Sequence, residues 1–178
     1  DPYTALYIHI PFCASKCAYC DFHSFATSTE DAAMESYVDD LILQIKRYAQ
    51  EGELANLSTI YIGGGTPTHL GHGLLTRLLY AISLYVHLER IEEFTIEANP
   101  ESLTEAMVKD MWSLGVNRLS LGVQSFDDAV LASIDRAHTA TDALHAIERA
   151  KTRFANVSVD LICGLPHQTR ESFLADVQ

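Results

Sequence analysis

The chain has 178 residues, 48% of them apolar, and a formal net charge of −12 at pH 7. This length allows a sizeable core, and the acidic balance argues against a phosphate-binding groove as the main function, so no nucleic-acid partner is expected. No secretory segment opens the sequence and no apolar run is long enough to span a bilayer. We therefore expect a cytoplasmic protein in a reducing compartment.

Apolar patterns predict five strands separated by helices. The strands are expected at about 6–10, 59–62, 94–98, 118–123 and 157–162. Helical spacing covers 34–45, 74–86 and 107–112, and shorter helices are expected after Ser125, after Thr139 and over 170–177. Ser102 with Glu105 predicts a capping box. Alternating strands and helices indicate an α/β protein with a parallel sheet and right-handed crossovers.

In each predicted strand, apolar residues alternate with polar or small ones. Strands covered on both faces are normally apolar on both, so one face here is expected to be polar. We predict a curved, partly open barrel with a polar inner face, in preference to a flat sheet with one solvated face. Five strands cannot close an eight-stranded barrel, so the sheet is expected to be open or truncated after the fifth strand.

Three cysteines follow the first predicted strand within eight residues: Cys13, Cys17 and Cys20. Three thiolates can bind three irons of a [4Fe–4S] cluster and leave the fourth iron open to a small molecule. Structural zinc, with His9 or His23 as a fourth ligand, is an alternative that the spacing leaves open. An odd number of neighbouring cysteines argues against disulfides.

A glycine-rich turn, 63–67, follows the second strand. It lacks the Lys-Ser/Thr ending of a phosphate loop, and its free backbone groups are expected to capture a carboxylate or an amine. Glu97, Gln124 and Asp160 lie at or near the carboxyl ends of strands, where α/β folds hold their sites. Each alone could be a solvated strand end, but together they indicate a ligand site. Arg136 could pair with a carboxylate or contact the ligand.

Two further residues have less certain roles. His9 should face the polar interior beside the cysteines, either as a hydrogen-bond donor to the site or as an ordinary hydrogen-bonded interior histidine. Cys163, just past the fifth strand, is expected to be a buried structural thiol.

Four segments resemble the oxygen-independent coproporphyrinogen III oxidase family, within the radical S-adenosylmethionine (SAM) superfamily. They are Tyr7-Ile-His-Ile-Pro-Phe-Cys13 with Cys13-x3-Cys17-x2-Cys20, Gly63-Gly-Gly-Thr-Pro67, Gly122-Val-Gln-Ser-Phe126 and Asp160-Leu-Ile-Cys-Gly-Leu-Pro166. The resemblance covers essentially the whole chain. It implies a partial (β/α)6 radical SAM barrel, with residues 1–178 forming an incomplete core domain whose C-terminal part is absent.

The resemblance also implies the site. The three cysteines would bind three irons, and SAM would chelate the fourth. Tyr7 matches a SAM-contacting position, and Tyr19 matches an aromatic residue near the adenine. The methionine part of SAM is expected at Gly64, Gly65 and Thr66, and the remaining contacts at Glu97, Gln124, Arg136 and Asp160.

One departure from the family pattern separates its branches. The oxidase branch has a further cysteine two residues after the third, where this chain has Phe22. The resemblance therefore points to the HemW-like haem chaperone branch. It implies haem or a porphyrin as ligand, a haem-accepting protein and a low-potential electron donor as partners, and membrane association only through an acceptor protein.

Two alternatives remain beside the chaperone. One is a coproporphyrinogen III oxidase that performs SAM-dependent oxidative decarboxylation, and the other is a radical SAM haem-degrading methyltransferase. Because Phe22 replaces the extra cysteine, oxidase activity is in doubt and whether the chain acts as an enzyme is left open. No catalytic residue is assigned.

Overall fold

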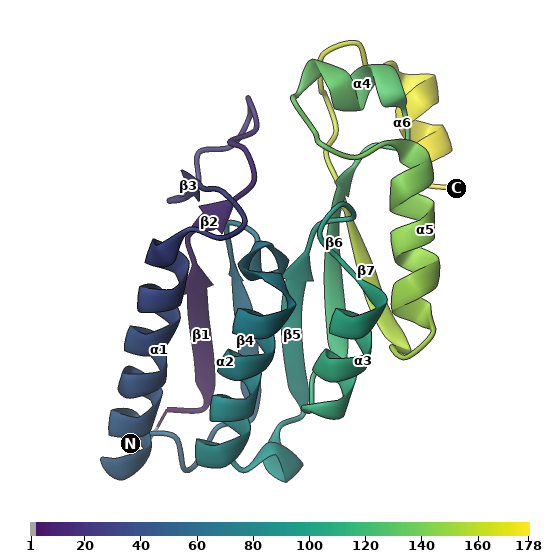
Figure 1. The fold of residues 1–178 in the computed structure, drawn as a ribbon. Coiled ribbons are helices and arrows are strands. Elements are labelled where there is room, and N and C mark those ends of the chain that lie inside the picture. Colours follow the sequence, from purple (N-terminus) through teal and green to yellow (C-terminus); the bar gives the residue numbers. More distant parts are fainter. Residues whose placement is uncertain (1–2) are drawn as a thin grey trace.

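The computed structural model describes residues 3–178 (Figure 1), so residues 1 and 2 of the expected core domain lie outside the described residues. A five-stranded sheet has the order β1-β4-β5-β6-β7, and all four neighbouring pairs are parallel. Its strands are β1 (Ala5–Ile10), β4 (Thr59–Gly64), β5 (Glu93–Ala98), β6 (Arg118–Gln124) and β7 (Asn156–Leu161). The predicted α/β class and parallel sheet are confirmed.

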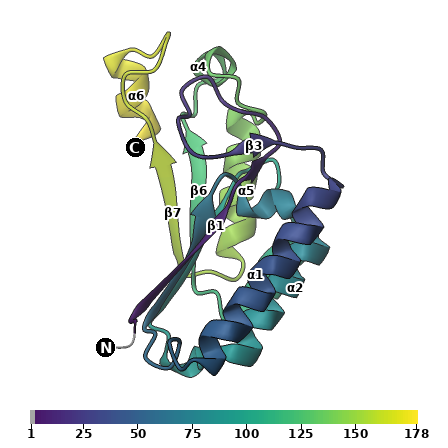
Figure 2. The same cartoon turned by 90° about the vertical axis from the view of Figure 1, so that its left-hand side faces the viewer.

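The long helices cover one face of this sheet, as Figure 2 shows for α1, α2 and α5. The helices are α1 (Ala32–Gln50), α2 (Gly71–Tyr85), α3 (Glu105–Ser113), α4 (Asp128–Ser133), α5 (Ala140–Lys151) and α6 (Arg170–Asp176), with short 3-10 turns at Pro67–Leu70 and Leu88–Arg90. Helices α4 and α6 lie beyond the carboxyl ends of the strands (Figure 1). In the described part of the chain, no helix has the length and hydropathy needed to cross a membrane.

The alternation within the strands separates the buried face from the polar face. Apolar side chains of the central strands are almost completely buried beneath the helices: Ile60, Ile62, Phe94, Ile96, Leu119 and Leu121. The intervening positions carry polar or small residues, including Tyr61, Glu97 and Asp160. With helices on one side and polar residues on the other, the sheet is the wall of the predicted partial β/α barrel.

The start of α3 differs from the prediction. Thr104 caps this helix, and its hydroxyl accepts a hydrogen bond from the Met107 backbone N–H at 3.2 Å. The predicted capping box of Ser102 with Glu105 is therefore wrong. The Ser102 hydroxyl lies 2.6 Å from the Thr68 hydroxyl, where it joins the chain after β5 to the turn after β4.

A short parallel pair, β2 (Phe12–Cys13) and β3 (Phe25–Ala26), was not predicted. The Phe25 N–H donates to the Pro11 carbonyl at 2.7 Å, and the Thr27 N–H donates to the Cys13 carbonyl at 2.9 Å. Strands of two residues are too short to show any periodicity in sequence. This pair closes the cysteine loop, residues 14–24, at its base.

Candidate functional site

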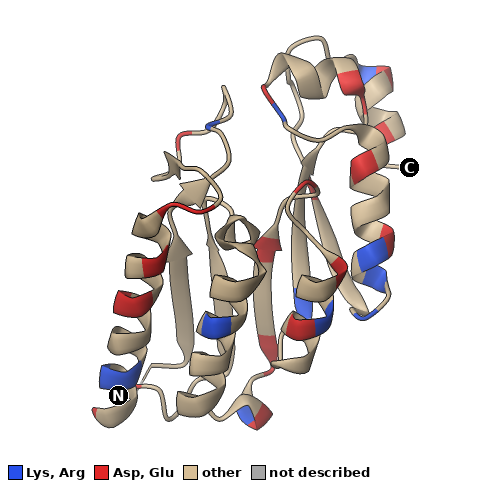
Figure 3. Ribbon diagram, in the orientation of Figure 1, with Lys and Arg blue, Asp and Glu red and all other residues tan. Residues whose placement is uncertain are grey.

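The cysteine loop, the glycine turn and the carboxyl ends of the strands line one pocket of about 320 Å³. All of the predicted site residues except Tyr7 line it: Cys13, Cys17, Tyr19, Cys20, Gly64, Gly65, Thr66, Glu97, Gln124, Arg136 and Asp160. Lys16 and Arg136 bring positive charge to the pocket lining. Figure 3 shows basic positions, in blue, both on the loop that follows β2 and on the loop beside α4. The structure thus brings together residues that are up to 147 positions apart, from Cys13 to Asp160.

The three thiols lie on one short, closed loop. Cys13 belongs to β2, and the Cys20 N–H donates to the Cys17 carbonyl at 3.0 Å. All three thiols are free and partly exposed. Among the described residues, no three His, Cys, Asp or Glu side chains converge on a single ion. Burial, together with contact to Cys17, raises the pKa of Tyr19 to about 12, so this phenol on the loop remains protonated.

Gly65 lets the glycine turn pass directly beneath Cys13. A Cβ atom at Gly65 would lie 2.7 Å from the Phe12 carbonyl oxygen and 2.9 Å from Cys13 Sγ. The Gly65 N–H donates to the Ile10 carbonyl at 2.8 Å, which fixes this approach. Glycine is needed here because no side chain fits between the two backbones.

Glu97 is held at the end of β5 by two donors. The Tyr61 hydroxyl donates to Oε1 at 2.6 Å and the Gly64 N–H donates to Oε2 at 3.0 Å. Burial and the hydrogen bond to Glu97 raise the pKa of Tyr61, so its phenol stays a donor. The N–H groups of Gly65 and Thr66 also donate to protein carbonyls. Because these three N–H groups are paired within the protein, the expectation that they capture a carboxylate is wrong. The expectation that the turn receives an amine stays a prediction, and Glu97 keeps lone pairs for such a group.

The end of β6 has an irregular backbone. The pairing of β6 with β7 shifts register between Gly122 and Gln124, and Gln124 has a φ of 73°. Such a bulge redirects the side chain that follows it, here into the pocket. On β7, the exposed Asp160 accepts hydrogen bonds from the Ser120 hydroxyl at 3.1 and 3.3 Å. Because Asp160 is exposed and hydrogen-bonded, its carboxylate can face the pocket without a large desolvation penalty.

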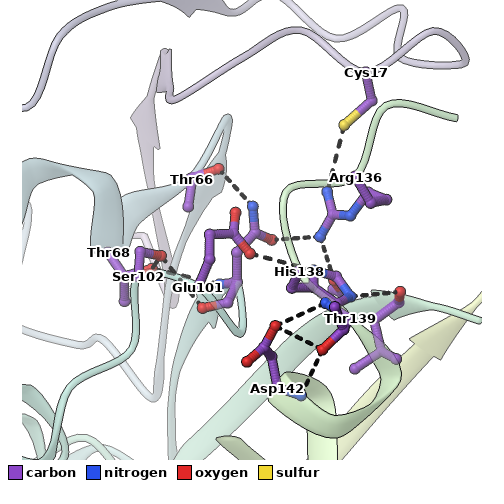
Figure 4. A network of polar contacts seen from close by, with 12 residues as sticks. Cys17, Thr66, Thr68, Glu101, Ser102, Arg136, His138, Thr139 and Asp142 are labelled. Atoms are coloured by element: carbon purple, nitrogen blue, oxygen red, sulfur yellow. Dashed lines mark hydrogen bonds and ion pairs between the residues drawn. The ribbon is translucent and has the colours of Figure 1, made fainter. Parts of the chain in front are cut away.

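Arg136 reaches the pocket from the loop between α4 and α5 (Figure 4). Its Nη1 donates to Cys17 Sγ at 3.4 Å, and its Nη2 donates to Asn99 Oδ1 at 3.2 Å and to the Gly122 carbonyl. Its Nε is buried and has no hydrogen-bond partner among the described residues. The guanidinium therefore joins the cysteine loop to the end of β6 and to the residue that follows β5.

The structure places Tyr7 and Cys163 differently from the predictions, and it decides between the two roles considered for His9. Tyr7 is 57% exposed and lies on the polar face below the pocket, with its hydroxyl 2.9 Å from His9 Nδ1. His9 Nε2 lies 2.9 Å from the His23 carbonyl, so His9 is a hydrogen-bonded tether of the cysteine loop. Cys163 is exposed, so the prediction of a buried thiol is wrong. Its neighbours Ile162 and Leu165 fill the small apolar cluster there instead.

Asn99 is the clearest residue that the sequence reasoning missed. Its Nδ2 donates to the Thr66 hydroxyl at 3.1 Å and its Oδ1 accepts from Arg136, so it connects the glycine turn to the guanidinium. Its position one residue past β5 was a usable signal, since strand ends converge at the site. Ser120, which also lines the pocket, shares its strand face with Gln124 and could have been found in the same way.

The chain matches the radical SAM superfamily over residues 7–178. "Heme chaperone HemW" of Lactococcus lactis is 43% identical over 173 residues, which are 97% of this chain and 44% of that protein. "Radical S-adenosyl methionine domain-containing protein 1, mitochondrial" of Mus musculus is 35% identical over 176 residues, which are 98% of this chain and 39% of that protein.

Solved structures give a consistent result. Coproporphyrinogen III oxidase (HemN) from Escherichia coli, described as a radical SAM enzyme, superposes with a TM-score of 0.86 at 29% identity. The alignment covers 99% of this chain and 40% of that one. The chain thus spans less than half the length of the relatives it matches.

Proposed function

The chain belongs to the radical SAM superfamily, and we propose that it forms the [4Fe–4S]- and SAM-binding core of a haem chaperone of the HemW type. The observation that carries the proposal is the convergence of three free thiols, Glu97 and Asp160 on one pocket. In this proposal, residues 1–178 are the radical SAM core, and haem binding and transfer are activities of the whole protein.

The residues of the pocket fit the two proposed groups. Cys13, Cys17 and Cys20 would each bind one iron, and the Arg136 guanidinium in the pocket lining would place positive charge beside SAM. Glu97 and Asp160 are acceptors suited to the amine and hydroxyl groups of SAM. When bound, a reduced cluster of this kind supplies the electron for SAM chemistry. The protein's part is to orient SAM with these side chains.

Phe22 favours the chaperone over the oxidase. Its ring is 65% exposed and lines the pocket beside the cysteines. A phenyl ring cannot ligate iron or take part in thiol chemistry, whereas a cysteine at this position could do both. The oxidase remains the second candidate because of the structural likeness to HemN.

The decisive experiment compares haem binding with porphyrinogen conversion in the full-length protein. After anaerobic reconstitution and with SAM and a reductant present, we expect spectroscopic titration to show haem binding in the absence of SAM cleavage. We expect no protoporphyrinogen to form from coproporphyrinogen III. SAM-dependent product formation that is lost in Cys17→Ala would instead establish the oxidase and contradict the chaperone.

The proposal also specifies partners and location. It requires a haem-accepting protein and a low-potential electron donor, and any contact with a membrane would pass through the acceptor. It places the protein in the cytoplasm or another reducing compartment, because the three cysteines must remain thiolates to bind iron.

Asp160 offers a direct test of the SAM site. Asp160→Ala is expected to weaken SAM binding about ten- to a hundredfold, because it removes a hydrogen-bonding acceptor from the pocket. Since Asp160 is exposed and is bonded to Ser120 alone among the described side chains, the fold and the cluster should be retained. Equilibrium dialysis with reconstituted protein measures the affinity, and iron and sulfide assays confirm the cluster.

A matched control for this variant is Glu148→Ala, which removes one negative charge from an exposed position on α5. It should leave SAM affinity unchanged. Equal affinities for Asp160→Ala and the unaltered protein would remove Asp160 from the SAM site.

A further inference from the structure

The most enclosed titratable side chain near the pocket is His138, on the loop between α4 and α5. Its side chain is 0% exposed. Nδ1 lies 3.2 Å from Glu101 Oε2, and Nε2 lies 3.1 Å from the Val123 carbonyl oxygen (Figure 4). Neither His138 nor Glu101 lines the pocket, so the proposed function leaves this pair without a role.

Both partners of His138 offer acceptor oxygens. A backbone carbonyl oxygen accepts hydrogen bonds, and an ionised carboxylate does the same. Burial opposes ionisation of Glu101, but the hydrogen bond with His138, a backbone hydrogen bond and the charge of Arg136 outweigh it and lower its pKa. The imidazole ring is therefore held between two acceptors, one near the end of β6 and one just past the end of β5.

His138 joins the same two segments that hold Arg136. Its Nε2 contact is at Val123, directly after Gly122, whose carbonyl accepts from Arg136. Its Nδ1 contact is at Glu101, two residues after Asn99, whose side chain also accepts from Arg136. The pair thus fixes the ends of β5 and β6 relative to the α4–α5 loop.

The loop has few other restraints near Arg136. Asp135, the preceding residue, has a φ of 57°, a backbone conformation that is unfavourable for most side chains. The Arg136 N–H donates to the Leu131 carbonyl at 3.0 Å, which fixes the backbone on the α4 side. On the α5 side, His138 is the residue that ties the loop to the sheet.

We propose that the buried His138 and its partner Glu101 form a positioning pair that holds the Arg136 guanidinium in the SAM site. This inference rests on the proposed function, because it concerns the same pocket. The pair does not touch the ligand. It acts by keeping Arg136 between Cys17, Asn99 and Gly122, where the guanidinium lines the pocket.

A double-mutant cycle on the reconstituted full-length protein tests the proposal. His138→Ala and Arg136→Ala should each lower SAM affinity, measured by equilibrium dialysis, by about tenfold. The double variant should bind no more weakly than Arg136→Ala alone, because the effect of His138 passes through Arg136. Glu101→Gln keeps the size of the side chain and removes its charge, and it should also weaken SAM binding. This variant provides the test if His138→Ala does not fold.

Val108→Ala is the matched control, since Val108 is buried on α3 and lies outside the pocket. It should lower the unfolding midpoint while leaving SAM affinity unchanged. The positioning role would be overturned if the fold-losses of SAM affinity in the two single variants multiplied in the double variant. It would also be overturned if His138→Ala and Glu101→Gln both bound SAM as tightly as the unaltered protein. A complete lack of SAM binding by the unaltered protein would instead contradict the proposed function, and the positioning role with it.

Discussion

Alanine in place of Cys13, Cys17 or Cys20 is expected to abolish cluster assembly. Each thiol would bind a different iron, so the loss of one leaves two attachment points on an exposed loop. Anaerobic reconstitution of the unaltered protein should yield about four irons and about four sulfides per chain, with broad visible absorption that is lost on reduction. Each variant should contain nearly none, although the fold should remain, because all three cysteines are partly exposed.

Cys163→Ala provides the matched control, since Cys163 is an exposed free thiol that does not line the pocket. It should retain the full iron and sulfide content. Stoichiometric zinc without acid-labile sulfide in the unaltered protein would contradict the cluster and favour a structural zinc site.

The second large effect is expected for Gly65→Ala. The added methyl group would lie 2.7 Å from the Phe12 carbonyl oxygen and 2.9 Å from Cys13 Sγ, closer than carbon atoms normally come to either. The nearest obstacle is backbone, so the strand that carries Cys13 must move. We expect the free energy of unfolding to fall by about 1–3 kcal/mol and the cluster content to fall several-fold. Urea unfolding and iron analysis measure these two effects.

Gly73→Ala makes the same chemical change where there is room for it. Gly73 lies in α2, and a Cβ there would have no neighbour within 4 Å. Alanine in a helix is favoured over glycine, so this variant should be more stable by about 0.5–1 kcal/mol and keep its cluster. If Gly65→Ala behaved like Gly73→Ala, the close contact with Cys13 would have no importance for the loop.

The sheet and the pocket could be predicted because both depend on strand periodicity. Leu119 and Leu121 point to the helices while Ser120 and Gln124 share the other face, and this pattern is visible in sequence. The carboxyl ends of parallel strands meet at one edge, so Glu97, Gln124 and Asp160 were correctly expected to lie together. Strand positions alone predict that these three side chains meet, and the conformation of the loops is not needed for that prediction.

The features that could not be predicted depend on loops. The choice of Thr104 over Ser102 as the cap of α3 follows from the contact between Ser102 and the distant Thr68. The bridging role of Asn99 requires Arg136 to reach the pocket from a loop 37 residues later in the chain. The two-residue strands that close the cysteine loop have no periodicity to detect. In each case the deciding partner is remote in sequence.

The order of the strands has a consequence for folding during synthesis. Each strand of the main sheet pairs with the strand before it in the same sheet, so a growing chain can add one strand–helix unit at a time to an existing edge. The backbone hydrogen bonds that pair β2 with β3 and join Thr66 to Phe12 lie within the first 66 residues. Arg136 and Asp160 leave the ribosome much later. The cysteine loop can therefore take its shape before the side chains proposed to contact SAM have been made.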